Sequence, residues 1–199
     1  MDVASDRSGL SSFLDPNIYK TPLKGVKAPL GFAKVNHCGR LDTTALIQAY
    51  KNSISSNITI SAFDYSKLEI TPAQLTYGEI SAKHLVFCEG YTMIDNPYFK
   101  DVPLVGSKGQ ILIIDAPELK LETILKGPIF IAPLGGDKYW AGASFEQHDK
   151  SLDITDEAAQ WLKTKIDRMI DVPYTIDRQI THIRPTVKDR RPLLGTHKK

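Results

Sequence analysis

A short loop, Leu134-Gly135-Gly136-Asp137, separates two β-patterned runs in the second half of the chain. Residues 129–133 precede the loop and residues 138–145 follow it. Glycine and aspartate tolerate the positive φ angles of a tight hairpin turn, so the loop predicts two adjacent antiparallel strands. Residues 104–114 contain a further strong strand pattern. The second half of the chain is therefore expected to form an antiparallel sheet.

The most regular helical pattern spans residues 153–170. Asp153 or Thr155 can cap its N-terminus, and acidic residues fill its first turn. Its apolar stripe consists of Leu162, Ile166, Met169 and Ile170. A strand pattern over residues 175–183 follows. The predicted fold class is α+β, a mixed, mainly antiparallel sheet with packed helices.

The first half of the chain has shorter patterns. Residues 1–30 are rich in Ser, Asp, Pro, Gly and Lys and predict a loop or arm. Asp42 is a candidate N-cap of a helix with the apolar stripe Leu46, Ala49, Tyr50 and Ile54. Strand candidates are residues 31–35, 58–63, 68–70, 77–80 and 83–88. The last of these is apolar enough for burial on both faces.

The charge and cysteine content of the chain exclude several classes of protein. With 25 basic and 23 acidic residues, the chain has no global field to attract nucleic acid or a membrane surface. No apolar run approaches membrane-spanning length. Cys38 and Cys88 cannot form a disulfide framework or a four-cysteine zinc site, and Cys88 lies in an apolar run that predicts its burial. A reducing, cytoplasmic setting is the simplest expectation.

The sequence contains no Gly-rich phosphate loop, no zinc-ligand spacing and no nucleophile elbow. Its five histidines are scattered. No residue is therefore predicted to be a catalytic acid, base or nucleophile, or a metal ligand.

One run near the end carries a functional signal. Residues 183–195 read Ile-Arg-Pro-Thr-Val-Lys-Asp-Arg-Arg-Pro-Leu-Leu-Gly, directly after the last strand pattern. The Arg184-Pro185 step places an arginine at the end of a sheet. A planar, permanently charged guanidinium there suits a carboxylate. An ion pair with a neighbouring acid is the structural alternative for Arg184.

Five segments in order resemble the D-amino-acid oxidase and glycine oxidase family of FAD-dependent oxidoreductases. They are residues 85–90 (LVFCEG), 108–112 (KGQIL), 130–133 (FIAP), 139–146 (YWAGASFE) and 183–185 (IRP), with the 153–170 helix before the last. Residues 39–42 (GRLD) and their helix are similar to the segment that precedes them in the family. The resemblance covers about residues 30–197.

The resemblance implies oxidation of an amine, amino acid or 2-hydroxy acid by hydride transfer to flavin. It implies that Arg184 binds the substrate carboxylate and that Phe130 and Trp140 wall the pocket. Core packing is the ordinary role of such aromatic residues. Glu89, Gly90 and Gly195 are expected to approach the FAD. The implied domains are an arm (1–30), part of an FAD-binding domain (31–92), a substrate domain (93–185) and a return segment toward the FAD domain (186–199).

Three departures from the family keep alternatives open. The dinucleotide-binding glycine motif is absent, and the chain stops soon after Gly195. Some members of the family have tyrosine where this chain has Phe130. The chain could thus be an internal or C-terminal-half fragment that does not retain FAD alone. It could also be a non-catalytic binding module, or a flavoenzyme acting on modified nucleosides in RNA. An exposed sheet edge could support a homodimer.

Overall fold

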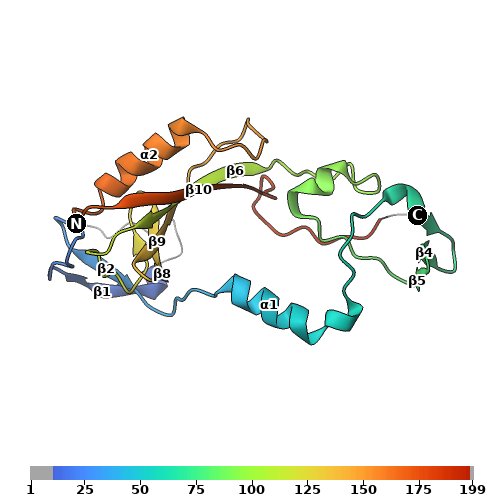
Figure 1. Ribbon diagram of the computed structural model, residues 1–199, viewed down its shortest axis with the longest axis horizontal. Helices are drawn as coiled ribbons and strands as arrows, with labels where there is room; N and C mark the ends of the chain where they lie inside the picture. The colour runs from blue at the N-terminus through green and yellow to red at the C-terminus, as the bar shows by residue number, and fades with distance from the viewer. Residues whose placement is uncertain (1–10, 198–199) are drawn as a thin grey trace. The chain divides into compact units, whose positions relative to one another are not determined.

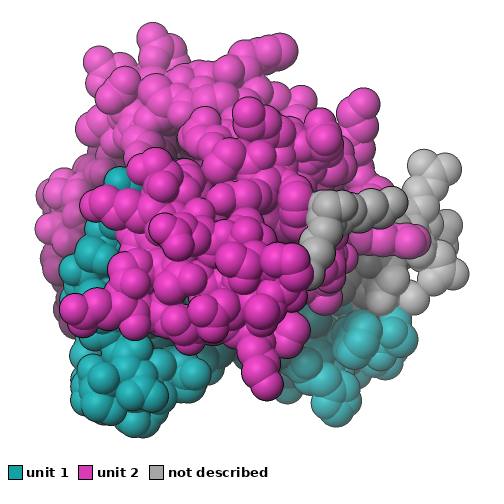
Figure 2. Space-filling view, turned by 90° about the vertical axis from the view of Figure 1, so that its right-hand side faces the viewer, with its two compact units in different colours: residues 1–22, 28–64 teal, residues 23–27, 65–199 magenta. Residues whose placement is uncertain are grey.

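The computed structural model describes residues 11–197. The chain divides into two compact units, drawn in different colours in Figure 2. One unit comprises Met1–Pro22 and Ala28–Asp64, and the other comprises Leu23–Lys27 and Tyr65–Lys199. The division thus falls between Asp64 and Tyr65 and at both ends of Leu23–Lys27, whereas the sequence suggested boundaries after residues 30, 92 and 185.

The larger unit contains a five-stranded antiparallel sheet (Figure 1). Its strands are β6 (Ser107–Asp115), β7 (Leu125–Lys126), β8 (Phe130–Gly135), β9 (Lys138–Gly142) and β10 (Thr175–Arg184), in the order β10-β6-β9-β8-β7. Gly136 and Asp137, with φ angles of 58° and 61°, make the turn between β8 and β9. The predicted hairpin is therefore confirmed.

The helix α2 (Asp156–Asp167) covers one face of this sheet. Thr155 is its N-cap, since its Oγ1 accepts a hydrogen bond from the backbone N–H of Ala158 at 3.3 Å. Leu162 and Ile166 are fully buried against the sheet. The same core contains Leu112, Ile114, Ala116, Leu119, Leu121, Ile129, Ile131, Tyr139, Ala141, Met169 and Ile170. The predicted stripe of the helix and the α+β class are thus confirmed.

A smaller three-stranded sheet belongs to the same unit. It consists of β3 (Leu68–Ile70), β4 (Leu75–Tyr77) and β5 (Ile80–Ala82). The 3₁₀ helices η4 (Tyr65–Lys67) and η5 (Gly90–Asp95) flank it in the sequence. Gly78, with φ of 58°, turns the chain between β4 and β5. The expected strand over residues 77–80 is therefore wrong, because a turn interrupts it.

The other unit contains η2 (Ser11–Phe13), β1 (Leu14–Tyr19), β2 (Phe32–Val35), α1 (Thr43–Ser53) and η3 (Ser55–Asn57). Because β1 pairs with β2, residues 1–30 are not a simple arm as expected, and the first ten lie outside the described residues. The predicted cap of α1 is confirmed, since Asp42 accepts from the N–H of Ala45 at 3.0 Å. No side chain of α1 is buried, and Tyr50 is 63% exposed.

Two predicted strands are absent from the described structure. Residues 58–63 and 83–88 have β-type sequences but pair with no neighbouring strand. Val86 is 78% exposed and Cys88 is exposed, so the predicted burial of both is wrong. A β pattern becomes a strand only where another backbone satisfies its hydrogen bonds. Within residues 11–197 no helix has the length and apolarity to cross a membrane.

Candidate functional site

The five-stranded sheet has two faces, of which α2 covers one. Side chains alternate along β6, so Leu112 and Ile114 point toward α2 while Ile111 and Ile113 point away from it. By the same alternation, a Cβ at Gly109 would be on the face of Ile111 and Ile113. Residues directly opposite one another in an antiparallel pair lie on the same face. We call the face away from α2 the open face. The register of the sheet then shows which predicted site residues share it.

Arg184 lies on the open face at the end of β10, directly opposite Ser107 of β6. Its guanidinium lies over the backbone of Gly109. A Cβ atom added at Gly109 would be 2.7 Å from Nη2, 2.9 Å from Cζ and 3.0 Å from Nη1 of Arg184. Within residues 11–197, no carboxylate forms an ion pair with Arg184, whose side chain is exposed. The arginine can therefore bind an external anion.

Phe130 and Trp140 also lie on the open face. Phe130 is opposite Gly142, and Trp140 is opposite Ile113. Phe130 is 44% exposed, and the Nζ of Lys126 lies 5.3 Å from the centre of its ring. Trp140 leans over Gly142, where an added Cβ would be 3.3 Å from its Cη2. Neither aromatic side chain belongs to the core beneath α2.

The sheet geometry separates these aromatic residues from Arg184. β8 lies three strand spacings from β10, about 14 Å at about 4.8 Å per spacing. Arg184 is also four residues beyond Ile180, which is on the level of Phe130, and this adds about 13 Å along the strand. Phe130 and Arg184 thus share a face but not one small pocket. Trp140, on the level of Arg178, is farther along still.

Glu89 has its carboxylate occupied within the chain. It accepts hydrogen bonds from the hydroxyl of Tyr65 and from Nδ2 of Asn96, the latter at 2.8 Å. Asn96 is fully buried. The hydrogen bond to Glu89 raises the pKa of Tyr65 to about 12. Through its side chain, Glu89 holds the loop before η5 in place.

Gly90 and Gly195 have open surroundings. A Cβ at either glycine would meet no atom within 4 Å, and Gly90 has a φ angle of 61°. The segment after β10 returns to the residues that follow η5, because the ring of His197 lies 5.7 Å from that of Tyr98. The backbones of both glycines are thus accessible, while the carboxylate of Glu89 is bonded to Tyr65 and Asn96.

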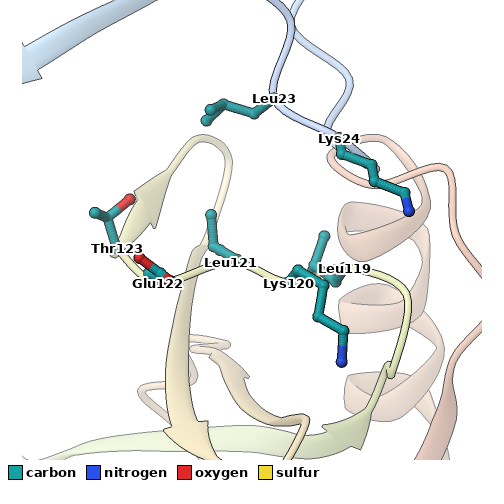
Figure 3. A pocket seen from close by; sticks show the side chains of 7 residues that line it. All are labelled: Leu23, Lys24, Leu119, Lys120, Leu121, Glu122 and Thr123. Carbon is teal, nitrogen blue, oxygen red and sulfur yellow. The ribbon is translucent and has the colours of Figure 1, made fainter.

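Two surface hollows lie elsewhere in the larger unit. One, of about 230 Å³, is lined by Leu23, Lys24, Leu119, Lys120, Leu121, Glu122 and Thr123 (Figure 3). The other, of about 400 Å³, lies beside the β8–β9 turn. Neither is lined by Arg184, Phe130 or Trp140. In the part of the chain that the structure describes, no three His, Cys, Asp or Glu side chains gather as metal ligands.

The sequence did not assign functions to three neighbours of Arg184 in the sheet. Gly109 lies beneath the guanidinium, while Lys108 and Gln110, both buried, point to the α2 face. Two polar residues on either side of a glycine inside an apolar strand pattern could have indicated that β6 contributes to a functional site. Glycine in a strand interior often marks close approach by another group, and buried Lys and Gln require partners.

Comparisons with known proteins connect this arrangement to one family. The model of the family described as FAD dependent oxidoreductase matches residues 21–199. The structure is similar to glycine oxidase from Geobacillus kaustophilus, with a TM-score of 0.52 and 21% identity over 62% of this chain and 36% of that one. It is also similar to glycine oxidase from Bacillus cereus ATCC 14579, with a TM-score of 0.50 and 16% identity over 66% of this chain and 39% of that one.

The chain thus spans little more than a third of either glycine oxidase. The two structural likenesses support the fold, and the family match supports the resemblance found in the sequence. Members of this family depend on FAD. Since the match covers most of its length, the chain belongs to the FAD-dependent oxidoreductases of the D-amino-acid oxidase type.

Proposed function

We propose that this chain supplies the substrate-side sheet of an FAD-dependent oxidoreductase that oxidises a small amine, amino acid or 2-hydroxy acid bearing a carboxylate. One observation carries the proposal: the exposed guanidinium of Arg184 rests on Gly109 without a carboxylate partner among the described residues. A free, planar, permanently charged fork is suited to bind a carboxylate with two parallel hydrogen bonds.

In this proposal each of the site residues has a separate role. Arg184 binds the carboxylate and thereby orients the Cα–H bond of the substrate. Phe130 and Trp140 present apolar surface farther along the open face, which suits them to exclude water beside the site rather than to contact a small substrate held by Arg184. The backbones of Gly90 and Gly195 allow close approach of the cofactor. FAD, when bound, would supply the hydride acceptor for oxidation of the amine or alcohol, which loses a hydride from Cα and a proton from its N or O to become an imine or ketone.

We also propose a cytoplasmic location, which the two free cysteines, Cys38 and Cys88, favour. The homodimer remains a prediction, and β10 at the edge of the sheet is the strand that could support it.

The full chain tests the function in two measurements. The purified protein is first examined for flavin absorbance, with and without added FAD. Loss of that absorbance is then followed anaerobically with glycine, D-alanine, sarcosine and lactate. We expect reduction by at least one of them and an increase in KM of about tenfold or more for Arg184→Ala, because a charge-assisted hydrogen bond contributes about 1.5–3 kcal/mol.

Arg178→Ala is the matched control for Arg184→Ala. Arg178 is on the same strand and, by its pairing with Ile113, on the same face, and its guanidinium is paired with Asp177 at 3.4 Å. Its loss removes the same charge but no free anchor. Equal effects of the two substitutions would reduce the role of Arg184 to general electrostatics. If the complete protein that contains this sequence bound no flavin under any condition, the proposed function would be contradicted.

A further inference from the structure

Gly109 occupies a position where glycine is unfavourable for the strand itself. It lies inside β6, with His182 of β10 opposite. Glycine in a strand interior loses more conformational entropy on folding than other residues and contributes no side-chain packing. A local gain must therefore offset this disadvantage at Gly109.

At Gly109 this gain is the close packing of the Arg184 guanidinium against the strand. Three atoms of the Arg184 guanidinium, Nη2, Cζ and Nη1, would lie 2.7–3.0 Å from a Cβ at this position. These separations are shorter than van der Waals contacts between such atoms. Even alanine, the smallest substituent, would therefore push the guanidinium off the sheet. Only glycine at position 109 leaves enough space for the guanidinium of Arg184 to lie against the strand.

We infer that Gly109 is a positioning residue: its missing side chain forms the seat that fixes the guanidinium of Arg184 and so determines where the substrate carboxylate binds. This inference rests on the proposed function of Arg184. It adds a specificity-determining position on a different strand, one that itself makes no contact with the substrate.

The backbone of β6 at Gly109 cannot shift to accommodate a side chain, because the residues on both sides of it are held by hydrogen bonds. On one side of Gly109, Lys108 exchanges backbone hydrogen bonds with Glu146, at 2.8 Å and 2.9 Å. The Nζ of Lys108 binds Asp149 and, at 3.1 Å, Ser151. These contacts tie the loop after β9 to β6 and immobilise the strand.

The other side of Gly109 is equally fixed. The backbone N–H of Gln110 donates to Oγ of Ser144 at 2.9 Å. The side chain of Gln110 is buried and bonds to Thr155 and Gln179. With both neighbours held, a Cβ at Gly109 moves Arg184 rather than β6. Since Arg184 meets the Cβ with the far end of a flexible, exposed side chain, the substitution costs little stability.

The test uses Gly109→Ala in the full chain and propionate as a simple carboxylate probe. Binding is followed by NMR titration, and folding by the thermal midpoint Tm. We expect the Kd for propionate to rise about tenfold while Tm stays close to the wild-type value, as expected for loss of one oriented charge-assisted bond. Gly39→Ala is the control, since a Cβ there meets nothing within 4 Å.

A double-mutant comparison assigns the effect to Arg184. In the Arg184→Ala background, Gly109→Ala should change the Kd by less than about twofold, because the seat then has no occupant. If Arg184→Ala leaves propionate binding intact, the proposed function of Arg184 fails. If Arg184→Ala weakens binding but Gly109→Ala does not, the anchor stands and the inference about Gly109 is overturned.

Arg184→Lys provides a second test that does not depend on the folding of any Gly109 variant. Lysine keeps the charge but has no planar fork to lie on Gly109. We expect its Kd for propionate to rise as much as that of Gly109→Ala. Wild-type affinity in Arg184→Lys would show that charge alone is sufficient, and it would overturn the inference.

Discussion

Gln179 donates a hydrogen bond of 2.7 Å from its Nε2 to Oε1 of Gln110, across β10 and β6 on the α2 face of the sheet. The same Oε1 accepts from the backbone N–H of Thr155 at 3.0 Å, and Nε2 of Gln110 donates to Oγ1 of Thr155 at 3.1 Å. The two faces at this end of β6 therefore differ in role. One face carries the free guanidinium of Arg184, and the other fastens the first turn of α2.

Replacement of Gln110 by leucine should destabilise the protein by about 2–3 kcal/mol, because partly buried hydrogen-bonding groups of Thr155 and Gln179 lose their partner. Denaturant unfolding measures the change. Gln160→Leu on the exposed side of α2 is the control and should change the unfolding free energy by less than about 0.5 kcal/mol. Equal losses in the two variants would contradict a structural role for the Gln110 network.

Thr155 and Thr181 should respond oppositely to replacement by valine. Thr155→Val removes the N-cap of α2 and should cost about 1–2 kcal/mol. The buried hydroxyl of Thr181 has no hydrogen-bond partner within residues 11–197. Thr181→Val keeps the shape and should be neutral or stabilise by up to about 1 kcal/mol. Thermal unfolding of both variants decides the matter, and a loss in Thr181→Val would reveal a partner for its hydroxyl.

The sequence predicts the sheet with α2 well because its signals there are mutually consistent. The Gly136-Asp137 turn fixes the hairpin, and the stripe containing Leu162 and Ile166 matches the face of a helix on a sheet. Residues 83–88 have an equally apolar pattern, yet they remain unpaired in the structure. A pattern records a preference of the local chain, whereas a strand also needs a partner backbone.

In the candidate site, too, some features could be predicted from the sequence and others could not. Arg184 was predictable because an Arg-Pro step after a strand is a local feature of the sequence. Its contact with Gly109 was not, because it depends on the register of β10 against β6 and on the path of a long side chain. The separation of Phe130 from Arg184 likewise follows from strand order, which residue types do not reveal.

The ion pair of Lys108 and Asp149 should make stability depend on acid pH. The hydrogen bond from Lys108 and, as the next largest cause, that from the backbone N–H of Ser151 lower the pKa of Asp149 to about 2. The unfolded carboxyl has a pKa of about 3.9. Because the folded value is lower, the stabilisation is present above pH of about 4 and is lost as pH falls through about 2. Thermal midpoints measured between these values should therefore drop more steeply for the wild type than for Asp149→Asn.

Asp153→Asn is the control for this pH dependence, since Asp153 forms no ion pair with any described residue. It should keep the wild-type slope. Asp149→Asn also leaves the amine of fully buried Lys108 without its carboxylate, so this variant should be less stable than the wild type at neutral pH. A wild-type slope in Asp149→Asn would show that other carboxylates cause the acid sensitivity.

Gly106, directly before β6, should be harder to replace than Gly136, another glycine with positive φ. Its φ angle is 67°, and an added Cβ would lie 2.4 Å from Cε2 of Tyr91. Gly136 has a similar φ of 58° but nothing within 4 Å of such a Cβ. Alanine at Gly136 should therefore cost only the backbone strain, about 1 kcal/mol, whereas alanine at Gly106 should cost about 2–4 kcal/mol because a clash is added.

The comparison of these two alanine variants separates backbone strain from crowding, and Tyr91→Ala completes it. Removal of the Tyr91 ring vacates the space above Gly106. In the Tyr91→Ala background, Gly106→Ala should cost no more than Gly136→Ala does in the wild type. Chemical denaturation gives the three differences. If the cost of Gly106→Ala is unchanged without the ring, the contact between η5 and the start of β6 does not explain why this position requires glycine.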